Sequence, residues 1–205
     1  MITLHHLRIG RSLFTVWLLE EAGAEYDLKV YLRDPETMRS QADLKAVHPL
    51  GKSPVIEDGD LMLTESGVIT NYILEKFDSD YVLHPSKDDL AAWATYQQWL
   101  TYPEGSVFAP LLLKMLTLRS GIDHPVITPF SDAEIKLHYG HIVSQLGEND
   151  YILGDKFSGA DFGICYVVSM GERLGQLADY PVLQAYMQRC MSRPAFLRAV
   201  EKAVE

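Results

Sequence analysis

The chain has 205 residues, of which 47% are hydrophobic and 22% are charged, and this ordinary globular composition excludes a disordered or fibrous polymer. Its 18 basic and 28 acidic side chains give a formal net charge of -10. Such an acidic chain has no basic surface overall to neutralise phosphates, so we expect neither nucleic acid nor a membrane as a partner.

The cysteines and the N-terminus bear on where the protein resides. Cys165 and Cys190 are too few for a disulfide framework and lack the spacing of a zinc or redox site, which predicts a reducing compartment and no metal. The N-terminal residues lack the basic start and the apolar run of a signal peptide, and no stretch reaches the ~18 apolar residues of a membrane span. We therefore expect a soluble cytoplasmic protein.

Residues 1–78 change period several times, which is typical of an α/β domain. Short or alternating apolar runs predict strands, and helical spacing of apolar residues predicts helices. The expected elements are a strand at 2–7, a helix from 13 that stops at 22–23, a strand at 26–32, a helix opened by Asp34-Pro35-Glu36 that reaches Ala46, a hairpin of 55–57 and 61–63, and a helix at 65–77.

The rest of the chain is helical almost throughout. Residues 78–88, which contain Pro85 and several acids, predict a linker. The expected helices beyond it span 89–102, 106–120, 132–146, 159–174, 182–191 and 193–204. We therefore expect two domains, at 1–78 and 89–205, of which the second is all-helical.

Four separated motifs follow this order of elements: WLLEE at 17–21, HPLGKSPVI at 48–56, TESG at 64–67 and FSGAD at 157–161. With them the whole chain resembles the cytosolic glutathione S-transferase family. The resemblance implies an α/β thioredoxin-like N-terminal domain, an all-α C-terminal domain, glutathione as co-substrate, a role in detoxification and a homodimer. The last motif has Ser158 three residues before Asp161, the spacing of a capping box, which we interpret as structural.

A site for glutathione, an anionic tripeptide, needs main-chain hydrogen bonds for the cysteinyl amide. Proline restricts the backbone and donates no N–H. A cis bond between Ser53 and Pro54, rare in general but implied by the resemblance, would turn Val55 outward and leave its N–H and C=O groups free for the ligand.

The charged ends of glutathione need partners. Ser66, at the start of a helix, is a candidate for the γ-glutamyl carboxylate, and Glu65 for the ammonium group. Lys52 is a candidate for the glycyl carboxylate, assisted by His48. A plain capping pair, a solvated lysine and a loop histidine are the alternative interpretations.

Catalysis needs a group that lowers the pKa of the thiol. Ser12 is the only hydroxyl in the turn at 8–12, which contains no tyrosine or cysteine, so we expect a serine-type enzyme with Ser12 as the candidate activating residue. A helix N-cap is the alternative role for Ser12. Ile9 and Gly10 stand where related bacterial sequences often carry serine or asparagine, a departure that leaves activity open. Backbone N–H groups at Gly10 and the charge of Arg11 are the alternative activators.

The electrophile pocket is expected between the domains, with Tyr102, Phe108 and Leu112 as substrate-binding residues and the Tyr102 hydroxyl directed to a leaving group or an oxyanion. Core packing and dimer contact are the alternatives for each of them. The favoured function is addition of the glutathione thiolate to a small hydrophobic electrophile. A non-catalytic glutathione-binding or adaptor module and a glutathione-dependent peroxidase are the alternatives.

Overall fold

The structure, a computed structural model, describes residues 1–204. By contacts the chain divides into two units. The first is Met1–Tyr81 together with the segment that begins at Ser192, and the second is Val82–Met191. No helix within residues 1–204 is long and apolar enough to cross a membrane.

The first unit is built on a mixed four-stranded sheet. Its strands are β1 (Ile2–Leu7), β2 (Tyr26–Tyr31), β3 (Val55–Asp58) and β4 (Leu61–Leu63), in the order β2-β1-β3-β4. β1 pairs parallel with β2 and antiparallel with β3, which pairs antiparallel with β4. β1 is central, and for this reason all of its residues except Thr3 are buried. The expected strand order in the chain and the hairpin are confirmed.

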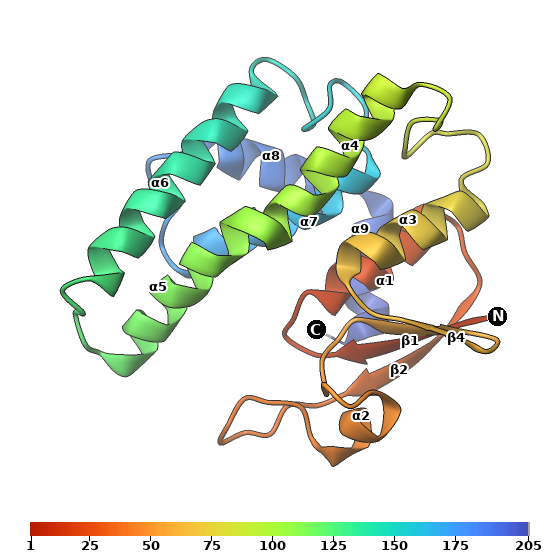
Figure 1. Ribbon diagram of the computed structural model, residues 1–205, viewed down its shortest axis with the longest axis horizontal. Helices are drawn as coiled ribbons and strands as arrows, with labels where there is room; N and C mark the ends of the chain where they lie inside the picture. Colours follow the sequence, from red (N-terminus) through yellow and green to blue (C-terminus); the bar gives the residue numbers. More distant parts are fainter. Residues whose placement is uncertain (205) are drawn as a thin grey trace. The chain divides into compact units, whose positions relative to one another are not determined.

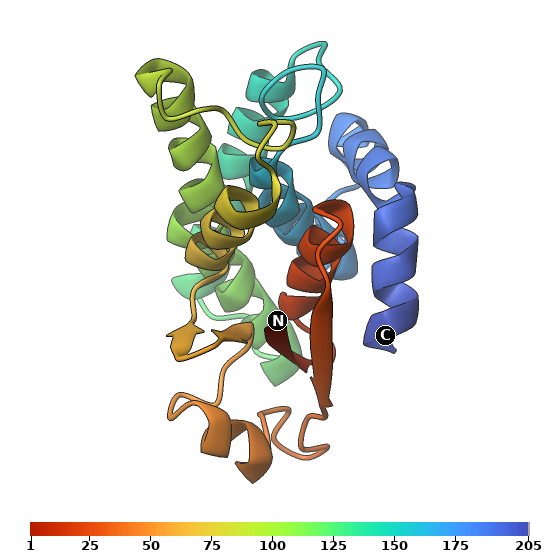
Figure 2. The same ribbon diagram turned by 90° about the vertical axis from the view of Figure 1, so that its right-hand side faces the viewer.

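Helices cover both faces of this sheet (Figures 1 and 2). α1 (Ser12–Glu21) and α3 (Ser66–Phe77) lie on one face, and α2 (Ala42–Val47) lies on the other. α1 buries eight consecutive residues, from Ser12 to Leu19, which a helix does only when neighbours surround it. The arrangement is that expected of an α/β thioredoxin-like domain.

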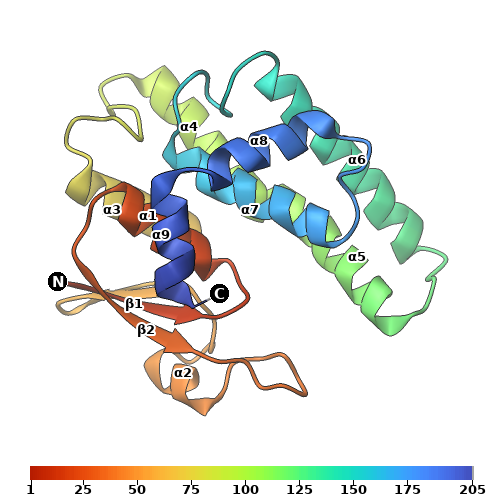
Figure 3. The ribbon, with the colours of Figure 1, turned by 180° about the vertical axis from the view of Figure 1, so that it is seen from behind.

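The last helix, α9 (Pro194–Ala203), packs against α1 (Figure 3). The ring of Phe196 meets Trp17 edge-on at 5.1 Å between centroids, and Arg193 forms an ion pair with Glu21. The sequence places this segment in the helical domain at 89–205, whereas in the structure it belongs to the first unit, because the apolar face of α9 is buried against α1.

The expected helix from Asp34 to Ala46 is wrong in its first half, and α2 starts only at Ala42. The Asp34 carboxylate accepts the N–H groups of Glu36 and Thr37, and the Asp34 N–H donates to the Arg39 carbonyl. A side chain that takes up main-chain N–H groups competes with helix formation. Residues 34–41 therefore form a loop.

The second unit is all-helical, as predicted. Its helices are α4 (Leu90–Tyr102), the π-helical turn η1 (Pro103–Val107), α5 (Phe108–Ser120), α6 (Ile127–Leu146), α7 (Gly159–Arg173) and α8 (Pro181–Met191). α4 continues into α5 through η1, where the sequence predicts a break (Figure 1). α6 starts before the predicted Asp132 because Nδ1 of His124 accepts the N–H groups of Val126 and Ile127.

α7 is central in this unit and packs against α4, α5 and α8. Its start has the predicted capping box between Ser158 and Asp161. Asp161 is fully buried, and burial raises the pKa of its carboxyl group. Gly171 allows Tyr139 of α6 to approach closely, since a Cβ atom there would lie 1.9 Å from the Tyr139 hydroxyl.

Candidate functional site

The loop before β3 lies against the carboxyl end of β1. The Ser53–Pro54 peptide bond is cis, as predicted. The Ser53 hydroxyl donates to the His5 carbonyl at 2.7 Å and accepts the Leu7 N–H at 3.1 Å. These two bonds connect the loop to the end of β1, where the turn toward α1 begins.

The main chain of Val55 is not free, contrary to the prediction. Along a strand, main-chain groups alternate between the two sides. The Arg8 N–H donates to the Tyr31 carbonyl on the β2 side, and the Leu7 N–H donates to the Ser53 hydroxyl on the β3 side. His5 lies two residues before Leu7, so its main-chain groups also point to the β3 side. Val55 lies directly opposite His5 and is fully buried, so its main-chain groups pair with β1. Within residues 1–204, the main-chain N–H and C=O of Ser53 have no such partner.

Glu65 and Ser66 form the start of α3. Glu65 is exposed and has φ 66° and ψ 113°, a conformation that costs energy for a residue other than glycine. Strained backbone of this kind clusters at ligand sites. Ser66 is the first residue of α3 and is half-buried, so its hydroxyl and the N–H groups of the first turn lie at the positive end of the helix. This end of α3 can bind an anion while Glu65 binds a cation.

Ser12 lies inside the protein rather than at the surface of the turn. Its side chain is fully buried. Its hydroxyl lies 2.9 Å from Nδ1 of His6, accepts the Leu7 N–H at 3.2 Å and faces the Leu7 carbonyl at 3.2 Å. The hydroxyl thus stabilises the end of β1, and to touch a thiol it would have to leave these bonds.

The exposed part of the turn is Ile9, with an exposed fraction of 54% and φ 58°. Gly10 and Arg11 follow it and are half-buried.

The two candidates for the glycyl carboxylate lie in the loop after α2. Lys52 is exposed. His48 is half-buried, and its Nδ1 accepts the Leu50 N–H at 3.4 Å, so this ring stabilises its own loop. No bond joins His48 to Lys52 in the part of the chain that the structure describes, and the assisting role of His48 therefore stays a prediction.

The three candidates for the electrophile site lie in the second unit. The Tyr102 hydroxyl is 2.6 Å from Nδ1 of His138 on α6. Burial, and next the charge of Glu134, raise the pKa of Tyr102, whereas burial lowers the pKa of His138. A neutral phenol beside a neutral imidazole can donate or pass on a proton. No sequence motif points to His138, because it meets Tyr102 only through the packing of α6.

Phe108 and Leu112 are both half-buried on α5. The ring of Phe108 stacks on Tyr166 of α7 at 6.1 Å between centroids. Phe108 therefore contributes to packing within the helical unit, and a role in substrate binding stays a prediction for both residues.

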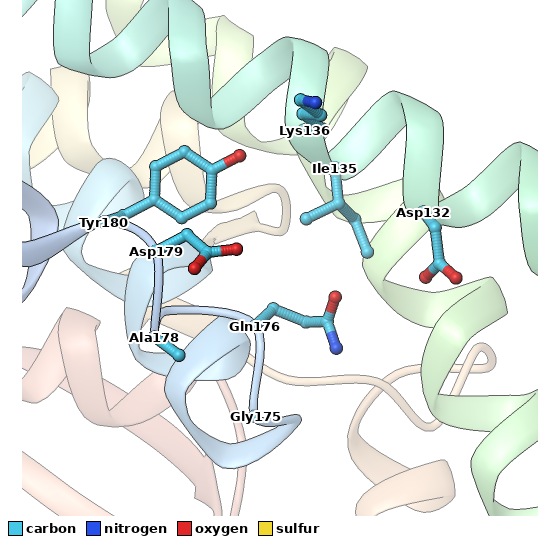
Figure 4. A pocket seen from close by; sticks show the side chains of 8 residues that line it. All are labelled: Asp132, Ile135, Lys136, Gly175, Gln176, Ala178, Asp179 and Tyr180. Atoms are coloured by element: carbon cyan, nitrogen blue, oxygen red, sulfur yellow. The ribbon is translucent and has the colours of Figure 1, made fainter.

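A separate cavity of about 520 Å³ lies between α6 and the loop from α7 to α8 (Figure 4). Its lining residues are Asp132, Ile135, Lys136, Gly175, Gln176, Ala178, Asp179 and Tyr180. None of the three predicted substrate-binding residues lines it. Asp132 is paired with Lys114 at 2.6 Å, so the lining charges are partly neutralised by the protein itself.

Cys165 and Cys190 are free thiols, both fully buried on α7 and α8. Burial, and next the contact with Cys190, raise the pKa of the Cys165 thiol. These cysteines are therefore unsuited to act as nucleophiles. Among residues 1–204 no group of three or more His, Cys, Asp or Glu side chains is arranged to hold a metal ion.

Comparison with known proteins agrees with this fold. Residues 1–75 match the family model "Glutathione S-transferase, N-terminal domain", and residues 132–194 match "Glutathione S-transferase, C-terminal domain". "Glutathione S-transferase 3" of Schizosaccharomyces pombe is 30% identical over 217 residues, which cover 98% of this chain and 88% of that protein.

Solved structures extend the comparison. The crystal structure of a glutathione S-transferase from Actinobacillus pleuropneumoniae is 34% identical, with a TM-score of 0.90, and the match covers 100% of this chain and 93% of that one. A glutathione transferase homologue from Sulfitobacter with bound glutathione has a TM-score of 0.81 at 22% identity over 100% of this chain and 99% of that one, and it shares the fold alone.

Proposed function

The chain belongs to the glutathione S-transferase family and is an enzyme of the glutathione transferase type, and we propose that it adds the glutathione thiolate to a small hydrophobic electrophile. The observation that carries the glutathione site is the start of α3, where an exposed Glu65 in a strained conformation precedes Ser66 at the helix N-terminus. Those two residues offer a carboxylate and an anion site side by side.

In this proposal the γ-glutamyl end binds at the start of α3, with its carboxylate at Ser66 and its ammonium group at Glu65. The cysteinyl main chain pairs with the N–H and C=O of Ser53, which replace those of Val55 because Val55 is paired with β1. Pro54, the next residue, is buried. Lys52, exposed in the same loop, binds the glycyl carboxylate.

The reaction then follows from the ligand's chemistry. The thiol loses its proton to solvent, and the thiolate forms a bond to an electrophilic carbon. In a substitution the leaving group departs with its electron pair. In an addition to an unsaturated carbonyl compound, the π electron pair moves onto the carbonyl oxygen. The Tyr102 hydroxyl donates a hydrogen bond to the negative charge that develops. Phe108 and Leu112 supply apolar contacts to the electrophile.

Binding to immobilised glutathione tests the site. The wild-type protein should be retained, and Glu65→Ala and Ser66→Ala should each lose retention. Glu25→Ala, at an exposed residue before β2, is the matched control and should be retained. A wild-type protein that is folded, by circular dichroism, and is never retained rules the site out.

A non-catalytic glutathione-binding module is the second candidate, favoured by the burial of Ser12 and by the isoleucine in the exposed turn. A rate assay with a halogenated nitroarene separates the two. Thiol conjugation above the uncatalysed rate supports the enzyme, and retention on glutathione without conjugation supports the module. Turnover of a hydroperoxide in place of the nitroarene would support the peroxidase.

We also propose that the protein is a cytoplasmic homodimer, as its family resemblance implies. Sedimentation velocity checks the oligomeric state, and a single species at the monomer mass would contradict it. Cell fractionation checks the compartment.

A further inference from the structure

Arg33, just after β2, reaches across to the turn between β1 and α1. Its Nε donates to the carbonyl groups of Arg8 at 2.9 Å and of Ile9 at 3.2 Å. One terminal nitrogen donates to the Ile9 carbonyl at 2.8 Å, and the other donates to the Met38 carbonyl at 2.8 Å. The half-buried guanidinium group therefore holds two successive peptide groups of the turn.

These bonds fix the direction of a main-chain N–H group. In a trans peptide the C=O and the N–H point in opposite directions. Because the carbonyl of Ile9 faces Arg33, the N–H of Gly10, in the same peptide group, points away from Arg33. In the described part of the chain this N–H donates to no other residue. A cation that binds the carbonyl also polarises the peptide and strengthens its N–H as a donor.

The local conformation depends on the same contact. Ile9 has φ 58°, which is strained for a β-branched residue and persists only where the surroundings hold it. A Cβ atom on Gly10 would lie 2.9 Å from the terminal nitrogen of Arg33 and 3.3 Å from the Leu7 carbonyl oxygen. The absence of a side chain at Gly10 thus allows the guanidinium group to approach.

The turn also lies where a bound cysteinyl residue would place its sulfur. Ser53, proposed above to pair with the cysteinyl main chain, is bonded to Leu7, and the turn begins at the next residue. Ser12 carries the only hydroxyl of the turn at 8–12, and its side chain is fully buried. A main-chain donor is therefore better placed than a side-chain hydroxyl to meet a thiolate.

We propose that Arg33 is a positioning residue that directs the N–H of Gly10 toward the glutathione sulfur, so that a polarised main-chain donor, rather than a serine hydroxyl, stabilises the thiolate. The proposal rests on the proposed function. The thiol proton goes to solvent, the sulfur keeps the electron pair, and the N–H donates a hydrogen bond to it without being transferred.

The test measures the pKa of the enzyme-bound thiol from the ultraviolet absorbance of the thiolate across a pH series, together with the pH profile of kcat/KM. Arg33→Gln should raise this pKa by about one unit and lower kcat/KM about tenfold at pH values below it. At pH values well above that pKa the difference should vanish, because the thiolate then forms unaided. Arg33→Lys should recover part of the loss. Arg39→Gln, which removes the same charge from an exposed position in the same loop, should change neither quantity.

Gly10→Ala approaches the contact from the other side, because its methyl group displaces the guanidinium group while the charge remains. Like Arg33→Gln, it should raise the pKa of the bound thiol. It provides the test if Arg33→Gln fails to fold. Unchanged pH profiles in the folded variants would overturn the proposal, as would an equal effect of Arg39→Gln.

S-methylglutathione, which has no ionisable thiol, separates this proposal from the proposed function. It should bind the wild-type protein and Arg33→Gln with similar affinity. If neither it nor glutathione binds the wild-type protein, the glutathione site itself is wrong. If both bind and Arg33→Gln leaves the thiol pKa unchanged, only the role of Arg33 is wrong.

Discussion

Nδ1 of His5, in the central strand, lies 2.9 Å from the hydroxyl of Tyr31 on β2. The other ring nitrogen is 3.4 Å from a carboxylate oxygen of Glu57 on β3. Burial is the main cause that lowers the pKa of His5, Glu57 opposes it, and Lys29 adds to it. The imidazole of His5, on β1, is therefore kept neutral between its partners on β2 and β3.

This relationship predicts a pH-dependent stability. Above the ordinary histidine pKa of 6.5 the ring is neutral in both the folded and the unfolded chain, and its contribution is complete. As the pH falls below that value the unfolded chain takes up the proton first, so the free energy of unfolding decreases until the pH has passed the folded pKa. Urea unfolding at a series of pH values should show this decline, and it should be shallower in His5→Gln. Parallel curves for the two proteins would contradict the prediction.

Ser12→Ala should cost stability rather than activity. It removes a buried hydroxyl that is bonded to His6 and Leu7, and each buried hydrogen bond that is lost typically costs about 0.5–1.5 kcal/mol. We expect a lower urea midpoint with an unchanged slope, and a normal rate of conjugation per folded molecule. If the rate is lost while the midpoint is unchanged, Ser12 touches the thiol, as the serine-type interpretation of the sequence holds.

Tyr102→Phe should lower turnover and leave glutathione binding intact. The variant keeps the ring, which packs against Trp99, and loses only the hydroxyl. A hydrogen bond to a developing charge is worth about 1.5–3 kcal/mol, so kcat/KM should fall about 10- to 100-fold. Tyr180→Phe, in the cavity of Figure 4, is the control and should keep full activity. Equal rates for wild type and Tyr102→Phe would place the electrophile elsewhere.

Asp161→Ala should be the most damaging of these substitutions for stability. The carboxylate accepts bonds from the Ile152 N–H, from the N–H and hydroxyl of Ser158, and from the Tyr186 hydroxyl. Removing it leaves these buried donors unpaired, and we expect a loss of about 3 kcal/mol or more, measured by urea unfolding. Asp155→Ala, an exposed acid in the preceding loop, should change stability little.

Much of this architecture follows from short-range patterns in the sequence. The apolar run of β1 and the helical spacing of apolar residues in the later helices are local properties. The capping box needs only Ser158 and Asp161 three residues apart. The family resemblance, and not spacing, predicts the cis bond between Ser53 and Pro54. Local patterns give the wrong element where a side chain competes with main-chain carbonyls for main-chain N–H groups, as in the loop after Asp34. Helix signals in the sequence do not show which acceptor the N–H groups take.

The sequence by itself determined the order and type of most elements and the helical character of the second unit, because each of these depends on residues a few positions apart. The start of α3 is a candidate ligand site through the family resemblance. Only the tertiary structure decided that Ser12 is buried, that Val55 is paired with β1, that His138 meets Tyr102 and that Arg33 holds the turn at Ile9. Each of these contacts joins residues of different elements or covers them with a neighbouring one. Their geometry is set by packing, which no local period encodes.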